Sequence, residues 1–402
     1  MNRLLMAFST LLICYFVYGF YISQINIDII PKKLKKDVVV DFYDYKGVLN
    51  VHSELSLGSS SYTQIISSAR AAGLDFIFFT DLNIFDVPFE LEGYHGDIFV
   101  FTAGKYSYLD SRIIHYSNNK ESLGDNLGTA QVKLSDYLSQ KNLSNKDQLL
   151  ILAHPFKTGF TWSGDIPQGM DGIEVINLKS LSNRAWENSK LSVLWSLFMY
   201  PFNSKLSLVR LFQEPTEELN LIDTTNAKQS LNFFAGAEAS ARAIPIANYL
   251  IKFPSYQKSF EIFSTHVLLK SELTGQVSSD KQKIYQALKS GSFYLAFDIL
   301  GDPKGFQAQL KENGKFYPMG SKVKFNKNLI LNAEVPAEPS DFYEIVVYRN
   351  GIRHATGNSS SINLQITEPG TYRIQVRVSP FLPLPDGKKW LTWIYTNPFY
   401  VY

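Results

Sequence analysis

The chain has 402 residues, of which 45% are hydrophobic and 19% are charged, and its net charge is +2. This length and composition are typical of two or three globular domains of about 100–200 residues each. The near-zero net charge and the lack of a basic stripe with interleaved aromatic residues argue against nucleic-acid binding. Cys14 is the only cysteine, which excludes internal disulfides and cysteine-based zinc or thiol chemistry in the folded part.

The first apolar segment lies at the N-terminus. Residues 4–22 carry no charge, and about 20 apolar residues cross a bilayer core as a helix. We therefore expect residues 1–23 to form a single-pass membrane anchor. A cleaved signal peptide is the alternative, although Val17-Tyr18-Gly19 is a poor cleavage site. Lysines in the tether, residues 24–43, favour a cytoplasmic globular part. A lone export-like segment favours the extracytoplasmic side, which we predict.

Residues 44–300 alternate apolar runs with helical patterns. Ser60 or Ser61 is placed to cap a helix that stops at Gly73, and residues 281–290 resemble the last helix of this domain. Continuous apolar strands separated by helices pair in parallel and are covered on both faces. The pattern predicts an α/β barrel or a doubly wound sheet. The runs typical of buried strands are 46–52, 75–80, 98–102, 149–153, 172–176 and 231–235.

An insertion near residues 185–215 interrupts this pattern. Leu191, Leu194, Trp195, Leu197 and Phe198 lie close together there, and the run breaks at a proline before it reaches the length of a membrane span. We expect a helix that packs on the barrel. A second membrane-facing surface is the alternative.

The last part of the chain, residues 301–402, has a different sequence pattern. Short alternating segments, such as residues 328–333, 343–348 and 371–377, are separated by turn signals that include Asn350-Gly351 and Pro369-Gly370. About 100 residues of this kind predict an immunoglobulin-like β-sandwich.

Polar motifs follow the predicted barrel strands, where the catalytic residues of α/β barrels gather. In chain order they are Asn50-Val-His52-Ser53, Thr80-Asp81-Leu82, Gly104-Lys105-Tyr106, Ala153-His154-Pro155 and Gly236-Ala-Glu238-Ala-Ser240. This series resembles the PHP (polymerase and histidinol phosphatase) family, whose members carry His-x-His-Ser, Thr-Asp-His, Gly-x-Glu, Ala-His-Pro and Gly-Ser-Asp-Ala-His. The resemblance extends to exported members with a C-terminal β-sandwich. It implies a distorted β/α barrel with up to three divalent metals that hydrolyse phosphoesters.

Several ligand positions of that family are changed in this chain. Leu57 and Leu82 stand where the family has an aspartate and a histidine, and Ser240 stands where it has a histidine. Asn50 replaces the first histidine, and Tyr106 replaces the bridging glutamate. Aliphatic side chains do not bind cations, so a multi-metal cluster is not expected.

The remaining donors are His52, His115, His154 and Glu238, with Asn50 as a weak oxygen donor. If they converge, they suffice for a single zinc or manganese ion. Lys105 opposes even this site, because an ammonium repels cations and can pair with Glu238.

The sequence therefore predicts a membrane-tethered PHP-type protein without a cofactor, acting as a binding or scaffolding module for an unknown protein or small molecule. The first alternative is a residual mononuclear metal-dependent phosphoesterase. The second is a changed chemistry in which Lys105 and Glu238 act as an acid–base pair.

Overall fold

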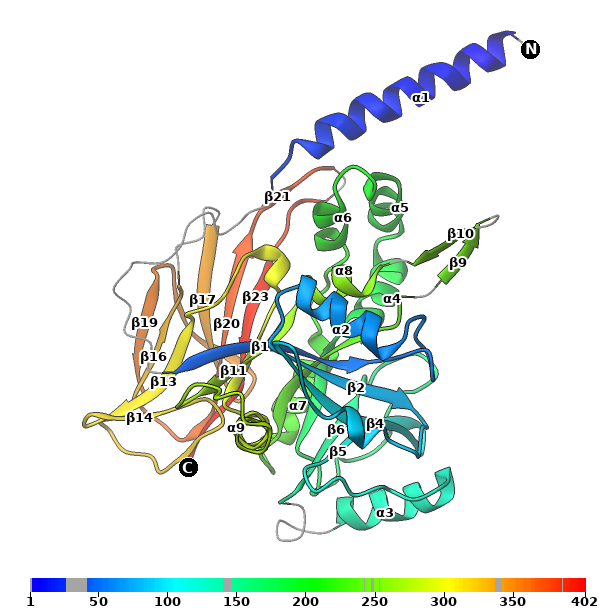
Figure 1. The fold of residues 1–402 in the computed structure, drawn as a ribbon. Helices are drawn as coiled ribbons and strands as arrows, with labels where there is room; N and C mark the ends of the chain where they lie inside the picture. The colour runs from blue at the N-terminus through cyan, green and yellow to red at the C-terminus, as the bar shows by residue number, and fades with distance from the viewer. Residues whose placement is uncertain are drawn as a thin grey trace.

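The computed structural model describes residues 2–26, 42–139, 146–241, 243–246, 249–252, 254–336, 342–384 and 386–402. Most of the expected tether, residues 27–41, lies outside the described residues. The C-terminal end of helix α1 (Asn2–Ser23) packs on the rest of the molecule, and its N-terminal end extends away from it (Figure 1). It is long and apolar enough to cross a membrane, as the sequence predicted.

Seven strands close into a barrel, so the doubly wound alternative is wrong. Strand β8 pairs back with β1, and five of the seven pairings around the ring are parallel. The two antiparallel pairings flank β5, which follows β4 after a short turn at Leu109 and Asp110. In order around the barrel the strands are β1 (Tyr43–Val51), β2 (Phe76–Leu82), β4 (Ile98–Tyr108), β5 (Ser111–Ser117), β6 (Gln148–Ala153), β7 (Gly172–Asn177) and β8 (Asn232–Ala239).

Helices cover the outside of the barrel (Figure 1). Helix α2 (Tyr62–Ala71) begins after Ser61 as predicted and buries Ile65, Ile66 and Ala69, which recur at helical spacing. Gly73 follows it with a left-handed backbone, φ +66°. The other helices are α3 (Leu127–Ser139), α4 (Leu178–Asn188), α5 (Lys190–Met199), α6 (Ser204–Arg210), α7 (Thr216–Thr225), α8 (Tyr256–Phe260) and α9 (Val277–Ser290).

The described residues of the C-terminal part form two main sheets and the small sheet of β21 (Phe381–Leu382) and β22 (Gly387–Lys388), which agrees with a barrel followed by a β domain. One sheet consists of β14 (Lys315–Tyr317), β13 (Gln307–Glu312), β16 (Ile330–Glu334) and β19 (Ser361–Gln365). The other contains β15 (Lys322–Val323), β17 (Phe342–Arg349), β18 (Ile352–Gly357), β20 (Gly370–Ser379), β23 (Leu391–Thr396) and β24 (Phe399–Val401). Further short elements are β3 (Gly93–His95) and the hairpin of β9 (Ala243–Ile246) and β10 (Tyr249–Lys252).

One sheet runs without a break from the barrel into the C-terminal part. The first half of β1 pairs with β11 (Ser264–Leu269), β11 pairs with β12 (Phe293–Ala296), and β12 pairs with β23. Backbone hydrogen bonds therefore cross the boundary that the sequence placed at residue 300. The residue composition changes near residue 300, but the hydrogen-bonded sheet continues across that boundary.

A buried ion cluster lies where β1 leaves the barrel toward β11. His266 Nδ1 lies 2.7 Å from Asp44 Oδ1, and His266 Nε2 lies 3.3 Å from Asp298 Oδ1. The Tyr294 hydroxyl donates to Asp44 Oδ2 at 2.6 Å. Burial opposes the charge of this imidazole, but the two carboxylates outweigh it and raise the pKa of His266 to about 10.

Candidate functional site

The C-terminal ends of the barrel strands bring several of the predicted residues together. Asn50 and His52 come at the end of β1, His154 directly follows β6, and Glu238 lies near the end of β8. Lys105 points toward them from within β4, and every one of these residues is buried. This end of the barrel therefore holds a compact cluster of polar side chains, as expected for the catalytic end of an α/β barrel.

The ammonium of Lys105 lies at the centre of this cluster. Its Nζ donates to Asn50 Oδ1 at 3.0 Å and lies 3.4 Å from His52 Nε2. Glu238 Oε1 is 3.8 Å away, and the Lys105 side chain has no exposed surface. The two side chains that sequence reasoning proposed as an acid–base pair therefore lie next to each other. Three residues proposed as metal ligands instead surround a cation supplied by the protein.

Two further cations belong to the same site, and sequence reasoning missed both. Lys157 Nζ lies 2.5 Å from Glu238 Oε1. The Arg112 guanidinium stacks over the Phe160 ring, 4.1 Å from its centroid, and its charge acts on Glu238. Two sequence signals were available: Lys157 comes three residues after His154, and Arg112 is the one Lys, Arg, Asp or Glu in the buried strand Ser111–Ser117.

Glu174 joins the cluster from β7 and was also missed. Its carboxylate accepts hydrogen bonds from Asn50 Nδ2 at 2.7 Å, from the His154 backbone N–H at 3.0 Å and from Asn177 Nδ2 at 3.0 Å. Gly236 leaves the space for this carboxylate, since a Cβ at that position would overlap Glu174 Oε1. A single glutamate within the apolar run of residues 172–176 was the available signal.

The backbone at this end of the barrel is strained. Asn50, His154 and Glu238 all have positive φ angles, 62°, 36° and 40°. Residues other than glycine adopt this region at a cost, and such positions concentrate at functional sites. The strain turns these three side chains toward the cluster at the ends of their strands.

Burial and charge together keep the imidazoles neutral. Burial, helped by the charge of Lys105, lowers the pKa of His154 to about 2 and holds the pKa of His52 well below its usual value. Burial also lowers the pKa of Lys105 to about 8, against the opposing effect of Glu238. Burial favours a protonated Glu238, but the surrounding cations, Lys105 first, depress its pKa well below the usual range. At neutral pH the cluster is therefore a lysine–glutamate network beside uncharged histidines.

The aspartate of the Thr80-Asp81 motif has a different role. Its carboxylate accepts from the Ser53 backbone N–H and hydroxyl at 2.7 Å each, from Ser56 Oγ at 2.5 Å and from the Tyr62 hydroxyl at 2.9 Å. These bonds fix the loop after β1 to the end of β2 and to α2. Asp81 thus holds the loop that follows His52.

His115 does not lie with the other proposed ligands. The register of β4 and β5 places Ile114 opposite Lys105 and His115 opposite Gly104. Side chains alternate between the two faces of a strand, so His115 points to the other side of the sheet from Lys105. There its Nε2 lies 2.6 Å from Gln148 Oε1, and its ring stacks on Tyr137. The assignment of His115 to the metal site is therefore corrected.

The donor set does not fit a divalent metal ion. Within the described part of the chain, no group of three or more histidine, cysteine, aspartate and glutamate side chains is arranged to hold one. The Lys105 ammonium lies among Asn50, His52 and Glu238, and Lys157 binds the same carboxylate oxygen of Glu238. A divalent cation placed among these groups would face two ammonium groups at close range.

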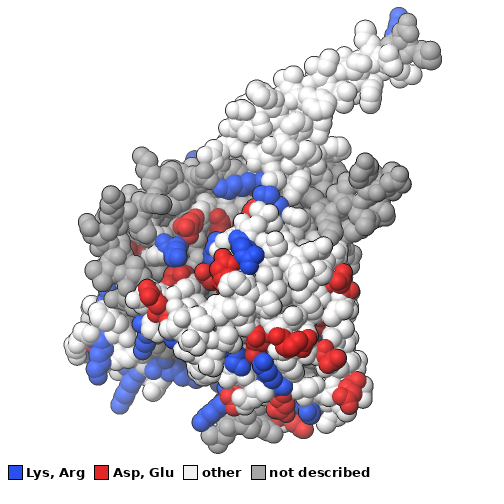
Figure 2. Space-filling view, in the orientation of Figure 1, with Lys and Arg blue, Asp and Glu red and all other residues white. Residues whose placement is uncertain are grey.

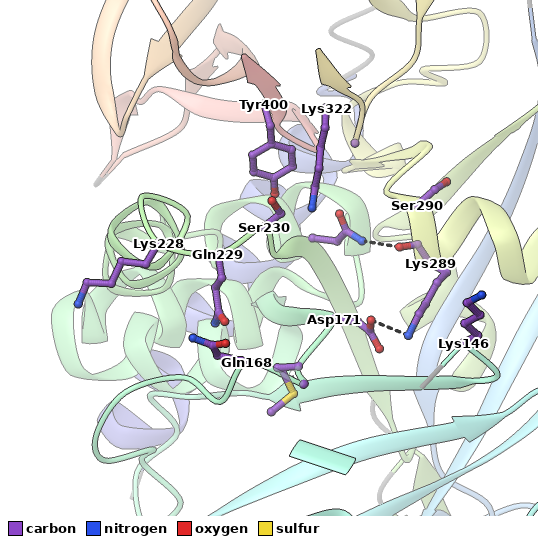
Figure 3. Close-up of a pocket in the computed structure, with 14 residues that line it drawn as sticks. Lys146, Gln168, Asp171, Lys228, Gln229, Ser230, Lys289, Ser290, Lys322 and Tyr400 are labelled. Atoms are coloured by element: carbon purple, nitrogen blue, oxygen red, sulfur yellow. Dashed lines mark hydrogen bonds and ion pairs between the residues drawn. The ribbon is translucent and has the colours of Figure 1, made fainter. Parts of the chain in front are cut away.

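A cavity lies at the end of the barrel where β6, β7 and β8 begin, opposite to the end that holds Lys105, and Figure 3 shows the residues that line it. It has a volume of about 580 Å³ and lies between the start of β6, β7 and β8 and the C-terminal strands. Lys289 pairs with Asp171 inside it at 2.7 Å. Its other lining residues include Lys146, Lys228 and Lys322. None of the residues of the Lys105 cluster lines this cavity.

Comparisons with known proteins give only distant similarities. No protein-family model and no curated protein matches the chain. One similar solved structure is a two-domain protein from Bacteroides vulgatus described as containing a predicted PHP-like metal-dependent phosphoesterase, with 12% identity and a TM-score of 0.40, covering 90% of this chain and 98% of that one. Another is PsfC from Pseudomonas syringae, with 12% identity and a TM-score of 0.35, covering 59% of this chain and 87% of that one. Both TM-scores are below 0.5, so neither similarity assigns a family or a function to this chain.

Proposed function

We propose that this chain is a membrane-anchored PHP-type barrel in which a buried ion-pair network stands in place of the metal cluster, and that the barrel works as a metal-independent binding module. The order of the strand-end motifs supports the family assignment. The length and apolar character of α1 support the anchor. One observation carries the functional part of the proposal: Lys105 Nζ lies 3.0 Å from Asn50 Oδ1, 3.4 Å from His52 Nε2 and 3.8 Å from Glu238 Oε1.

The charges of the site favour an anionic ligand. Lys105, Lys157 and Arg112 supply three positive charges, and Glu238 supplies one negative charge. Burial raises the pKa of Glu174 and so opposes a second negative charge beside Asn50. Guanidinium and ammonium groups at a site of low dielectric bind phosphate or carboxylate oxygens strongly. A module of this kind would hold an anionic group without cleaving it.

Two measurements on the full chain in detergent test this proposal. Thermal unfolding should be unchanged by Zn²⁺ or Mn²⁺, and hydrolysis of p-nitrophenyl phosphate with these ions should stay at the background rate. Inorganic phosphate should raise the unfolding temperature of the wild type but not of Lys157→Met. A matched control is Lys311→Met, because Lys311 lies in β13, away from the barrel cluster. Metal-dependent hydrolysis that His154→Ala abolishes would overturn the proposal.

A residual mononuclear phosphoesterase is the second candidate, and one observation favours it. Both ring nitrogens of His154 are buried without a hydrogen-bond partner among the described residues. A buried imidazole with two free nitrogens is available to a ligand. The same two measurements separate the candidates, since only the phosphoesterase requires His154 and a divalent ion together.

A further inference from the structure

Helix α5 presents its large apolar side chains to the outside. Ser192, Ser196 and Met199 face the body of the protein and are buried. In a helix that packs on a core in water, the apolar stripe faces inward and the polar side chains face outward. In α5, by contrast, two of the three buried residues are serines. The exposed apolar residues are Leu191, Leu194, Leu197 and Phe198, with exposed fractions of 72%, 41%, 52% and 63%.

A neighbouring turn adds to this apolar area. Phe381 and Leu384, in the β21–β22 segment, are 72% and 80% exposed. Asp386 fixes the turn to the helices, because it lies 2.7 Å from Arg210 Nε of α6 and accepts from Ser192 Oγ of α5 at 2.6 Å. We define the outer apolar surface as Leu191, Leu194, Leu197, Phe198, Phe381 and Leu384. An exposed patch of this kind marks a contact site.

Helix α1 packs directly beside this surface. The Tyr15 hydroxyl donates to the Phe198 carbonyl at 2.9 Å, and Trp195 Nε1 donates to the Tyr18 hydroxyl at 3.0 Å. Gly19 lies against the Phe202 ring so closely that a Cβ there would overlap it. The last two turns of α1 and the α5–α6 helices therefore form one packed unit, and Figure 1 shows them at the same end of the molecule.

The position of these contacts along α1 determines how deep α5 would lie in a bilayer that surrounds α1. Residues 4–22 at 1.5 Å per residue span about 28 Å, which matches a hydrocarbon core of about 30 Å. Tyr15 lies seven residues, or about 10 Å, before the end of this segment at Ile22. Since Tyr15 touches Phe198, a bilayer around α1 also reaches Phe198. Tyr15, Tyr18 and Trp195 are residue types that concentrate at membrane interfaces.

We propose that the outer apolar surface is a second membrane contact, inserted at the boundary between headgroups and acyl chains in the leaflet that holds the C-terminal half of α1. The proposal rests on the anchor role of α1 proposed above. Interfacial helices bury their apolar face about 5–10 Å into this boundary, which agrees with the depth given by Tyr15. The visible surface of α1 is uncharged except at its free end, where Figure 2 shows a cation. The barrel is then held against the bilayer at two places rather than through α1 alone.

Depth-dependent quenching of a fluorescent label tests this contact in the full chain. Cys14→Ala removes the only native thiol, and single cysteines are then introduced as Phe198→Cys, Leu11→Cys and Ile352→Cys for labelling with an NBD fluorophore. All three positions are exposed, so labelling leaves the core intact. Leu11 reports on α1, and Ile352, in the C-terminal β domain, is the matched exposed apolar control. Each protein is reconstituted in phosphatidylcholine vesicles with and without brominated acyl chains.

We expect blue-shifted emission at Phe198→Cys and at Leu11→Cys, with bromine quenching several-fold stronger than at Ile352→Cys. Quenching at Leu11→Cys together with water-like emission at Phe198→Cys would overturn the second contact and leave the anchor standing. Lack of quenching at Leu11→Cys would overturn the anchor itself. A blue shift at Phe198→Cys that bromine does not quench and that grows with the protein-to-lipid ratio would mean that a second copy of the chain covers the surface, which also contradicts the proposal.

Discussion

Two buried clusters in this protein hold their histidines in opposite protonation states. His266, between β1 and β12, is flanked by two aspartates, and its pKa rises to about 10. His154, at the end of β6, is equally buried but lies near lysines, and its pKa falls to about 2. The cluster at His266 is thus a closed ion pair, whereas the imidazoles beside Lys105 stay neutral.

This contrast separates a structural cluster from a candidate site. At His266 both ring nitrogens face carboxylates, and Tyr294 adds a hydrogen bond to Asp44. At His154 neither ring nitrogen has a partner among the described residues, and the backbone is strained. Unpaired buried polar atoms and strained backbone occur together where a protein gives up stability for function. Substitutions in the two clusters should therefore change stability in different ways.

The largest effect is expected for Glu238→Gln. This change removes the carboxylate that Lys105 and Lys157 share, and breaking a buried ion pair by removing one partner costs about 3–5 kcal/mol. Chemical denaturation at pH 7 measures the loss. The double variant Lys105→Met/Glu238→Gln should recover part of it, because one unpaired ammonium is then removed. A loss below about 1 kcal/mol would mean that the network is not a tightly paired unit.

The contribution of Glu238 to the free energy of unfolding should depend on pH. Because its folded pKa is depressed, its contribution to stability is present above the unfolded pKa of about 4.3 and is lost as the pH falls below that value. The stability difference between wild type and Glu238→Gln should therefore shrink on acidification from pH 5 to pH 3. A difference that stays constant over this range would contradict the assignment of Glu238 as ionised.

A smaller loss, about 3 kcal/mol, is expected for His266→Gln at pH 6, because a buried ion pair is broken but Tyr294 still bonds Asp44. The folded pKa of His266 is about 10. Its contribution is therefore complete below the unfolded pKa of about 6.5 and is lost as the pH rises toward 10. Denaturation at several pH values should show the wild type losing its advantage over the variant between pH 7 and pH 10.

The smallest effect, with the opposite sign, is expected for His154→Gln. In the folded chain His154 stays neutral, while in the unfolded chain it takes up a proton below about pH 6.5. The wild type should therefore lose stability relative to the variant by about 1.4 kcal/mol per pH unit below that value, or about 2 kcal/mol by pH 5. An unchanged difference between pH 7 and pH 5 would show that this imidazole is protonated in the fold.

The sequence predicted the parts of the fold that local patterns control. The apolar runs at residues 98–102, 149–153 and 172–176 lie within β4, β6 and β7, and the helix after Ser61 is present. The order of the motifs also predicted that Asn50, His52, His154 and Glu238 lie at one end of a barrel. These features depend on periodicity and on strand ends, which a single sequence displays.

The remaining features depend on long-range pairing. His115 was misplaced because the register of β4 and β5, and not residue type, decides which face a side chain occupies. The pairing of β12 with β23 joins residues about 100 positions apart, and no local sequence pattern indicates it. Lys157 and Glu174 become visible as members of the site only when the loop after β6 and strand β7 are placed beside Glu238 and Asn50.

The replacement of the metal cluster by an ion-pair network is tested most directly by the metal content of the full chain. The chain is purified in detergent, dialysed and analysed by inductively coupled plasma mass spectrometry. Because the Lys105 ammonium lies among Asn50, His52 and Glu238, we expect far less than one zinc, manganese or iron ion per chain, both in the wild type and in His154→Ala. One or more tightly held divalent ions per wild-type chain that are lost in His154→Ala would contradict it.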